Sequence, residues 1–200
     1  KPRQRHHSLL LLLILATLMP YHSCLVGDLW GFCNFPSMFQ TSLQTYPQRV
    51  DFEKVKGYWY VVARKNMAAI KDCLCNDSEY ALTSAHSFEI TNVCTLKNGK
   101  MRKVRGSAVP LDSNKTKLKV SFFKYLPSGN YWFLDVAPDY SWFVLGEPCR
   151  LFGFIMAKTE TVSKEVMDKA ETVLRKCGYS TDDMIYRDKT CPRNFHLVRP

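Results

Sequence analysis

The chain has 200 residues, of which 46% are apolar, and a formal net charge of +10 at pH 7. This length and apolar content allow one well-buried domain, or barely two. After residue 20, no run approaches the roughly 18 consecutive apolar residues that a membrane-spanning helix needs.

The first 27 residues have the order of a secretory signal peptide. Lys1, Arg3 and Arg5 precede an apolar run that ends at Met19, and such a run is too short to act as a stable membrane anchor. We expect cleavage before residue 28, which predicts a secreted, extracellular protein. Residues 28–50 predict an N-terminal coil that leads into the folded domain.

Seven cysteines remain after residue 27, so at least one thiol is unpaired within a monomer. Disulfides persist in oxidising compartments, which agrees with export. In Cys73-Leu74-Cys75 only one residue separates the two thiols, and no second Cys/His pair lies nearby in the sequence, so we expect no metal site. No pattern indicates a cofactor.

Two sequons predict N-glycosylation in a eukaryotic secretory pathway, one at Asn76 and one at Asn114. Both fall where turns are expected. A disulfide at the neighbouring Cys75 could hinder the use of Asn76.

From residue 57 onward, short runs rich in β-branched and aromatic residues alternate with turn signals about every ten residues, which is typical of an all-β sandwich or barrel. An Asn98-Gly99 pair predicts a tight hairpin turn. The predicted strands are 57–67, 78–85, 87–96, 100–110, 117–124, 130–137, 140–146 and 151–158.

The densest basic cluster falls on the fourth of these strands and the turn before it. It consists of Lys97, Lys100, Arg102, Lys103 and Arg105. No aromatic side chains that could stack on bases are interleaved with these cations, so the pattern favours a solvated hairpin over a nucleic-acid site.

After the last strand the apolar period changes to that of a helix. Apolar residues recur at helical spacing from Val166 to Cys177, with Ser163 as a candidate N-cap and Gly178 at the C-terminal end. The apolar stripe must be buried, and the outside of the sheet is the surface available. Residues 184–187 predict one more short strand, and residues 192–200 a C-terminal tail.

The predicted fold class is therefore mainly β: an eight-stranded antiparallel up-and-down barrel with one C-terminal α-helix packed outside. Closing the sheet removes exposed edges, and eight strands leave an interior that can hold one small ligand.

Three features in order resemble the lipocalin family of the calycin superfamily: Gly57-Tyr58-Trp59, the Pro138-Asp139-Tyr140 turn, and a basic residue, Lys158, after the last barrel strand. The resemblance covers roughly residues 48–191 and fits the branch of apolipoprotein D, insect bilin-binding protein and bacterial outer-membrane lipocalins. It implies a barrel with its helix over residues 51–191.

The resemblance also implies a barrel floor made by Gly57, Trp59 and Lys158. Lipocalins usually carry arginine at the last position, and a lysine can still make a cation–π contact with the tryptophan. A second departure is Phe154, where related sequences often have tryptophan.

With Trp59 facing inward, period-2 alternation places Val61 and Ala63 inside the barrel. Matching the other strands to the family pattern gives the ligand-binding residues that the resemblance implies. They are Tyr80, Leu82, Phe88, Ile90, Leu118, Val120, Phe122, Tyr131, Phe133, Phe143, Leu145, Phe152, Phe154 and Met156.

Disulfides are also implied by the resemblance. Cys33 would join Cys149, and Cys191 would join either Cys73 or Cys75, which leaves one of those two over. The two remaining cysteines, Cys94 at an inward-facing strand position and Cys177 on the helix stripe, are expected to be buried thiols.

The function that these features favour is a non-catalytic extracellular carrier of a small hydrophobic ligand such as a fatty acid, sterol, retinoid or bilin. One alternative is a lipocalin-type isomerase that uses Cys94 as a cavity nucleophile, which requires a lowered thiol pKa. The other is an interaction module that binds a protein receptor or a membrane surface independently of any ligand. The sequence leaves the oligomeric state open.

Overall fold

The structure is a computed structural model that describes residues 43–191 apart from residues 85 and 123–127. The expected signal peptide, most of the N-terminal coil with Cys33, and the tail over residues 192–200 lie outside the described residues.

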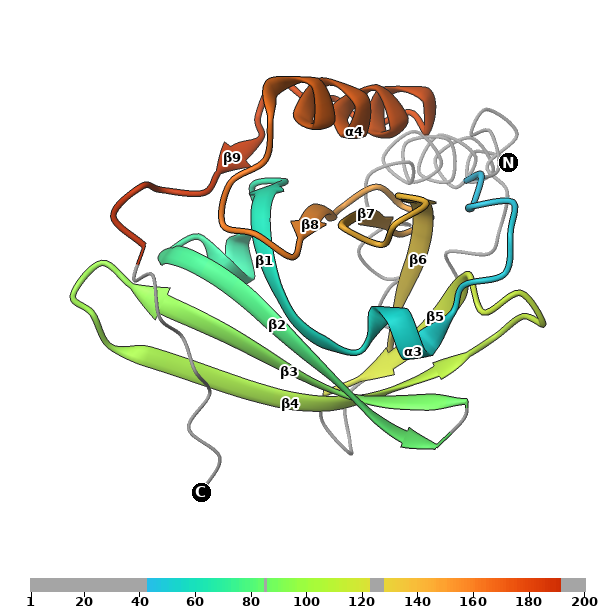
Figure 1. The fold of residues 1–200 in the computed structure, drawn as a ribbon. Coiled ribbons are helices and arrows are strands. Elements are labelled where there is room, and N and C mark those ends of the chain that lie inside the picture. Colours follow the sequence, from blue (N-terminus) through green and yellow to red (C-terminus); the bar gives the residue numbers. More distant parts are fainter. Residues whose placement is uncertain (1–42, 85, 123–127, 192–200) are drawn as a thin grey trace, which may run out of the picture.

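Eight antiparallel strands close into a barrel, as predicted (Figure 1). Each strand pairs with the next, and β1 pairs with both β2 and β8, which closes the sheet. The strands are β1 (Gly57–Arg64), β2 (Cys73–Ser84), β3 (Ser87–Leu96), β4 (Met101–Pro110), β5 (Lys117–Ser121), β6 (Gly129–Val136), β7 (Trp142–Gly146) and β8 (Gly153–Ala157). Gly99 has a positive φ of 79° in the predicted β3–β4 hairpin turn.

Strand β2 begins at Cys73, five residues before the predicted start, so the expectation that Asn76 lies in a turn is wrong. The polar run Asn76-Asp77-Ser78 reads as a turn in the sequence, but it pairs along β3. Asn76 is half-buried there, whereas Asn114 is exposed in the turn between β4 and β5.

One helix, α4 (Lys164–Lys176), covers the outside of the barrel as predicted (Figure 1). Ser163 caps its N-terminus by accepting a hydrogen bond from the Val166 backbone N–H. Ala170 and Leu174 are fully buried against β6, β7 and β8. The helix is followed by a short strand, β9 (Ile185–Tyr186), which pairs with β1 near the predicted position.

Apolar side chains form two clusters, one inside the barrel and one between the barrel and α4. All fourteen residues predicted to face the cavity belong to the inner cluster. Ala63 does not, so its predicted inward orientation is wrong: it packs with Val62 in the outer cluster. A bulge between Val61 and Ala63 causes the difference, because an extra residue inverts the alternation beyond it.

A short helix that the sequence analysis did not predict, α3 (Phe52–Val55), lies just before β1. The Asp51 side chain caps it by accepting a hydrogen bond from the Glu53 backbone N–H at 3.0 Å. Phe52 and Val55 point into the inner cluster, so the helix closes one end of the barrel. Among the described residues, no helix is both long and apolar enough to cross a membrane.

Candidate functional site

The structure brings the three predicted floor residues together. The Trp59 indole N–H donates to the Val55 carbonyl at 2.6 Å. Lys158 Nζ lies 3.8 Å from the centre of the Trp59 ring and donates to the Lys56 carbonyl at 3.0 Å. Gly57 has a φ of +102°, a conformation that favours glycine, so the chain can turn from α3 into β1 beneath the lysine.

Aromatic rings fill the space above this floor. The ring centres of Trp59 and Phe143 are 4.2 Å apart, and those of Phe52 and Phe88 are 4.3 Å apart. Desolvation lowers the pKa of Lys158 to about 8. The floor is thus a packed region in which a half-buried ammonium faces an aromatic ring, and none of its three residues lines the cavity described below.

The Pro138-Asp139-Tyr140 turn lies at the same closed end of the barrel. Its backbone closes through a hydrogen bond from the Tyr140 N–H to the Ala137 carbonyl at 2.8 Å. The Tyr140 hydroxyl in turn accepts from the Asp51 backbone N–H at 2.9 Å, which ties the turn to the start of α3.

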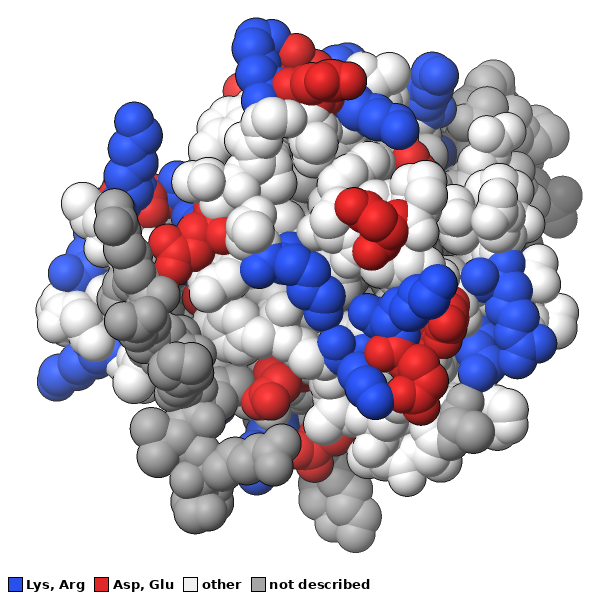
Figure 2. All heavy atoms as spheres, in the orientation of Figure 1, with Lys and Arg blue, Asp and Glu red and all other residues white. Residues whose placement is uncertain are grey.

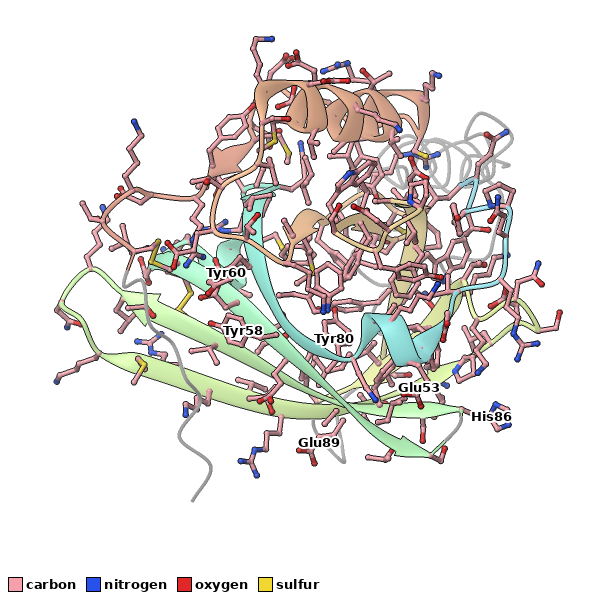
Figure 3. The ribbon with its side chains drawn as sticks, in the orientation of Figure 1. Glu53, Tyr58, Tyr60, Tyr80, His86 and Glu89 are labelled. Atoms are coloured by element: carbon pink, nitrogen blue, oxygen red, sulfur yellow. A yellow bond between two sulfur atoms is a disulfide. The ribbon has the colours of Figure 1, made fainter. Side chains whose placement is uncertain are left out.

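A cavity of about 460 Å³ is lined by residues of β1 to β4 and β6 to β8, and by the segment after β1 that contains the short 3₁₀ helix η2 (Ala68–Ile70). Six of the fourteen predicted residues line it: Tyr80, Phe122, Tyr131, Leu145, Phe154 and Met156. Figure 3 shows Tyr80 inside the barrel. The other eight are packed in the inner cluster and are absent from the cavity wall: Leu82, Phe88, Ile90, Leu118, Val120, Phe133, Phe143 and Phe152.

One wall of the cavity is polar, and the sequence analysis did not identify it. It includes Asn76, Ser78, Asn92 and Arg102. The Ser78 hydroxyl donates to Asn92 Oδ1 at 2.7 Å across the β2–β3 pair. Alternation carried back along β2 from Tyr80 would have identified Ser78 and Asn76, because residues two apart share a face. The apolar residues Met67 and Ile70, from the connection between β1 and β2, also line the cavity.

Two tyrosines, Tyr80 and Tyr131, provide hydrogen-bond donors within the apolar part of the cavity wall. Burial raises the pKa of Tyr131 to about 12 and raises that of Tyr80 further. Both hydroxyls therefore keep their protons at neutral pH. The Tyr80 hydroxyl makes only a weak contact with the Met156 sulfur at 3.8 Å, so it can be redirected towards an acceptor on a ligand.

Two disulfides hold the open end. Cys75 pairs with Cys191, which resolves the choice between Cys73 and Cys75. Cys73 pairs with Cys94, so the expectations of a leftover thiol in the Cys73/Cys75 pair and of a free thiol at Cys94 are both wrong. An irregularity in β2 between Cys73 and Cys75 separates their partners: Cys73 lines the cavity beside Cys94, and Cys75 does not.

The remaining cysteines differ in state. Cys149 is disulfide-bonded, and its predicted partner, Cys33, lies outside the described residues. Cys177 is a free thiol at the C-cap of α4, where it is half-buried, and burial raises its pKa. The isomerase hypothesis loses its proposed nucleophile, because a disulfide-bonded Cys94 has no thiolate to attack a substrate.

A buried ion pair fixes the outer face of the polar wall. Arg187 donates to Asp77 Oδ1 at 2.6 Å, and the two side chains are only 5% and 3% exposed. The Arg187 guanidinium also lies over the Tyr60 ring, 4.9 Å from its centre. Burial raises the pKa of Asp77, and the charge of Arg187 opposes that shift. Asp77 also lines the cavity, but its carboxylate is already paired with Arg187.

Comparison with known proteins agrees with this architecture. A family model described as a lipocalin-like domain matches residues 50–189. Temperature-induced lipocalin-1 from Arabidopsis thaliana is 31% identical over 134 residues, which span 60% of this chain and 72% of that protein. Apolipoprotein D from Macaca fascicularis is 26% identical over 155 residues, 72% of this chain and 80% of that protein.

Solved structures share the fold at lower identity. Insecticyanin from the tobacco hornworm Manduca sexta superposes with a TM-score of 0.60 at 16% identity, covering 75% of this chain and 86% of that one. Lobster apocrustacyanin A1 superposes with a TM-score of 0.57 at 19% identity, covering 70% of this chain and 81% of that one. With the family model spanning the barrel and its helix, the chain belongs to the lipocalin family.

Proposed function

We propose that this protein is an extracellular carrier that holds a small amphipathic ligand in the open-end cavity. Lipocalins bind small hydrophobic ligands, and one observation supports this role here: a cavity of about 460 Å³ has an apolar wall of core residues and stands on a closed, packed floor. Its volume falls within the range of small-molecule sites.

The apolar wall can supply most of the affinity. A ligand that buries about 300 Å² of apolar surface gains about 7 kcal/mol from transfer out of water, before association costs. That gain allows useful binding without any covalent or metal chemistry.

The polar wall restricts the class of ligand. The charged residues along the described wall are Asp72, Asp77 and Arg102, and Arg187 already pairs with Asp77. A ligand with an apolar body and a carboxylate end fits this arrangement, with the body against Phe154 and Met156 and the carboxylate near Arg102. A long-chain fatty acid has this chemistry.

A displacement assay tests the carrier role. An environment-sensitive apolar dye should bind saturably, with one site per chain, and palmitate should displace it. Arg102→Ala should weaken palmitate about fivefold, as expected for a solvent-accessible ion pair, and should leave hexadecanol unchanged. Arg105→Ala, a change of the same charge outside the cavity wall, should leave both ligands unchanged. Failure of the dye to saturate would contradict the carrier role. Equal effects of Arg102→Ala on both ligands would contradict the carboxylate assignment.

Secretion and glycosylation form a second part of the proposal. The Cys73–Cys94 and Cys75–Cys191 disulfides suit an oxidising compartment. Expression in a eukaryotic host should release a processed chain into the medium, and N-terminal sequencing of that chain identifies the cleavage site. A glycosidase-sensitive mass shift should disappear in Asn114→Gln and persist in Asn76→Gln, because Asn114 is exposed and Asn76 is half-buried in β2. A chain retained in the cells without processing would contradict secretion.

A further inference from the structure

The β3–β4 hairpin extends past the part of β5 that the structure describes. Strand β4 pairs with β3 from Met101 to Ala108. Strand β5 reaches only Ser107–Pro110 of β4. Residues 101–106 therefore have a strand on one side and, among the described residues, none on the other. Figure 1 shows the hairpin turn extending to the left, away from the body of the barrel.

This hairpin carries positive charge without compensating negative charge. All five cations of its basic cluster (Lys97, Lys100, Arg102, Lys103 and Arg105) are exposed, and residues 90–111 contain no Asp or Glu. No ion pair between described residues involves any of the five. The effect of Lys97 on Asp188 is small: hydrogen bonds from Thr190 are the main cause of the lowered pKa of that carboxylate. Blue side chains stand out at the left margin of Figure 2, where the hairpin lies.

Apolar groups and the cavity meet at the same place. Met101 is 48% exposed and Val104 is 36% exposed, in the middle of the basic cluster. Val104 and Arg102 also line the cavity, because they face inward from β4. The basic hairpin is therefore one side of the cavity entrance.

We propose that the β3–β4 hairpin docks on an anionic lipid surface, with Lys100, Lys103 and Arg105 among the lipid headgroups and Met101 in the interface. Docking would place the cavity entrance against the membrane, so that an apolar ligand could enter without crossing water. This transfer step rests on the proposed carrier function, whereas the docking itself does not.

The distribution of charge favours a lipid surface over a protein partner. The cations lie on the turn and on both faces of β4, since alternation places Arg102 opposite Lys103 and Arg105. A protein strand that paired with the β4 edge would contact only the row of backbone groups along that edge. A membrane surface can contact the cations of the turn and of one face of β4 together. Each basic residue held near an anionic membrane strengthens binding about fivefold.

A simpler interpretation assigns the cations a protective role. Charged residues on an open strand edge discourage pairing with other chains. This interpretation predicts self-association when the charges are removed, and it predicts no preference for anionic lipid.

Vesicle flotation of the purified full chain distinguishes these interpretations. Phosphatidylcholine vesicles give the baseline, which includes any contribution from the N-terminal apolar run, and vesicles that also contain phosphatidylglycerol give the charge-dependent part. We expect binding to anionic vesicles at low salt and its loss at high salt. Combining Lys100→Gln, Lys103→Gln and Arg105→Gln should lower the partition coefficient about 100-fold.

The matched control removes the same charge from α4, through Lys164→Gln, Lys169→Gln and Lys176→Gln, all exposed. It should keep the partition coefficient within about threefold, because distant surface charges are screened. Equal loss in both triple variants, or no preference for anionic vesicles, would overturn the docking. So would unchanged vesicle binding by a hairpin variant that self-associates, or capture of polyglutamate but not of vesicles.

Dye binding measured on the same samples separates the two proposals. Both triple variants should bind the dye as the wild-type chain does. A wild-type chain that binds anionic vesicles but not the dye would refute the carrier role and leave the docking in place.

Discussion

At its closed end the barrel is filled, and at its other end it is hollow, although the same strands build both ends. The closed end packs Trp59, Phe143 and Phe52 ring against ring and adds α3 as a plug. The open end places Asn76 and Ser78 on the inner face of β2 and leaves a cavity. A side chain on the inner face of the barrel is therefore not necessarily a ligand contact. Side chains near the floor pack against one another, and those farther from the floor can line the cavity.

Two disulfides cross-link the open end, whereas the closed end has packed rings. Their removal should have the largest effect on the free energy of unfolding. Cys75 and Cys191 are 116 residues apart in sequence, and Cys73 and Cys94 are 21 apart. Loop-closure entropy predicts losses of about 5 and about 3 kcal/mol in the free energy of unfolding when each pair is replaced by serine. Urea denaturation measures both. The reverse order would show that the open end does not depend on the longer cross-link.

The closed end should respond to loss of its central ring. Trp59→Ala should lower the free energy of unfolding by about 3 to 5 kcal/mol, because the ring is fully buried and supports Lys158. Dye affinity, measured under conditions where the variant remains folded, should change much less. Trp59→Phe keeps a ring and should lose less stability than Trp59→Ala. Intact stability with lost binding would contradict the assignment of Trp59 to the floor.

The contrast between the two ends also explains what the sequence could predict. Regular alternation and turn signals identified all eight strands, α4 and β9, and the family motifs identified the floor. The sequence analysis did not predict the residues at the open end, because strand irregularities and a polar strand segment break the simple alternation. The irregularity at Val61–Ala63 turns the Ala63 side chain to the outer face of β1. The polar run at Asn76 has the composition of a turn but lies in β2. The pairing of Cys73 with Cys94 depends on the register of β2 against β3, which a single sequence does not determine.

The smallest expected effect is a titration at the floor. Lys158 has a pKa lowered to about 8 by desolvation, against an ordinary value of 10.5. The folded chain therefore releases this proton before the unfolded chain does, and the Lys158 contribution to stability rises with pH between those two values. The fluorescence difference between the wild-type chain and Trp59→Phe should show a transition near pH 8.

Two substitutions at the same position serve as controls for that titration. Lys158→Met removes the titrating group, and Lys158→Arg keeps the charge at every accessible pH, so neither should show the transition. A midpoint near 10.5, or a transition that persists in Lys158→Met, would show that the ammonium is not desolvated at the floor.

The most direct test of the account compares two phenylalanines of the inner cluster. Phe154 lines the cavity, and Phe133 is also buried in the inner cluster but is absent from the cavity wall. Both alanine variants should lose about 3 to 5 kcal/mol of stability. The dissociation constant of the dye should rise at least about tenfold in Phe154→Ala, equivalent to about 1.4 kcal/mol, and stay within about twofold of wild type in Phe133→Ala. Loss of binding in Phe133→Ala with normal binding in Phe154→Ala would place the ligand elsewhere and contradict the account.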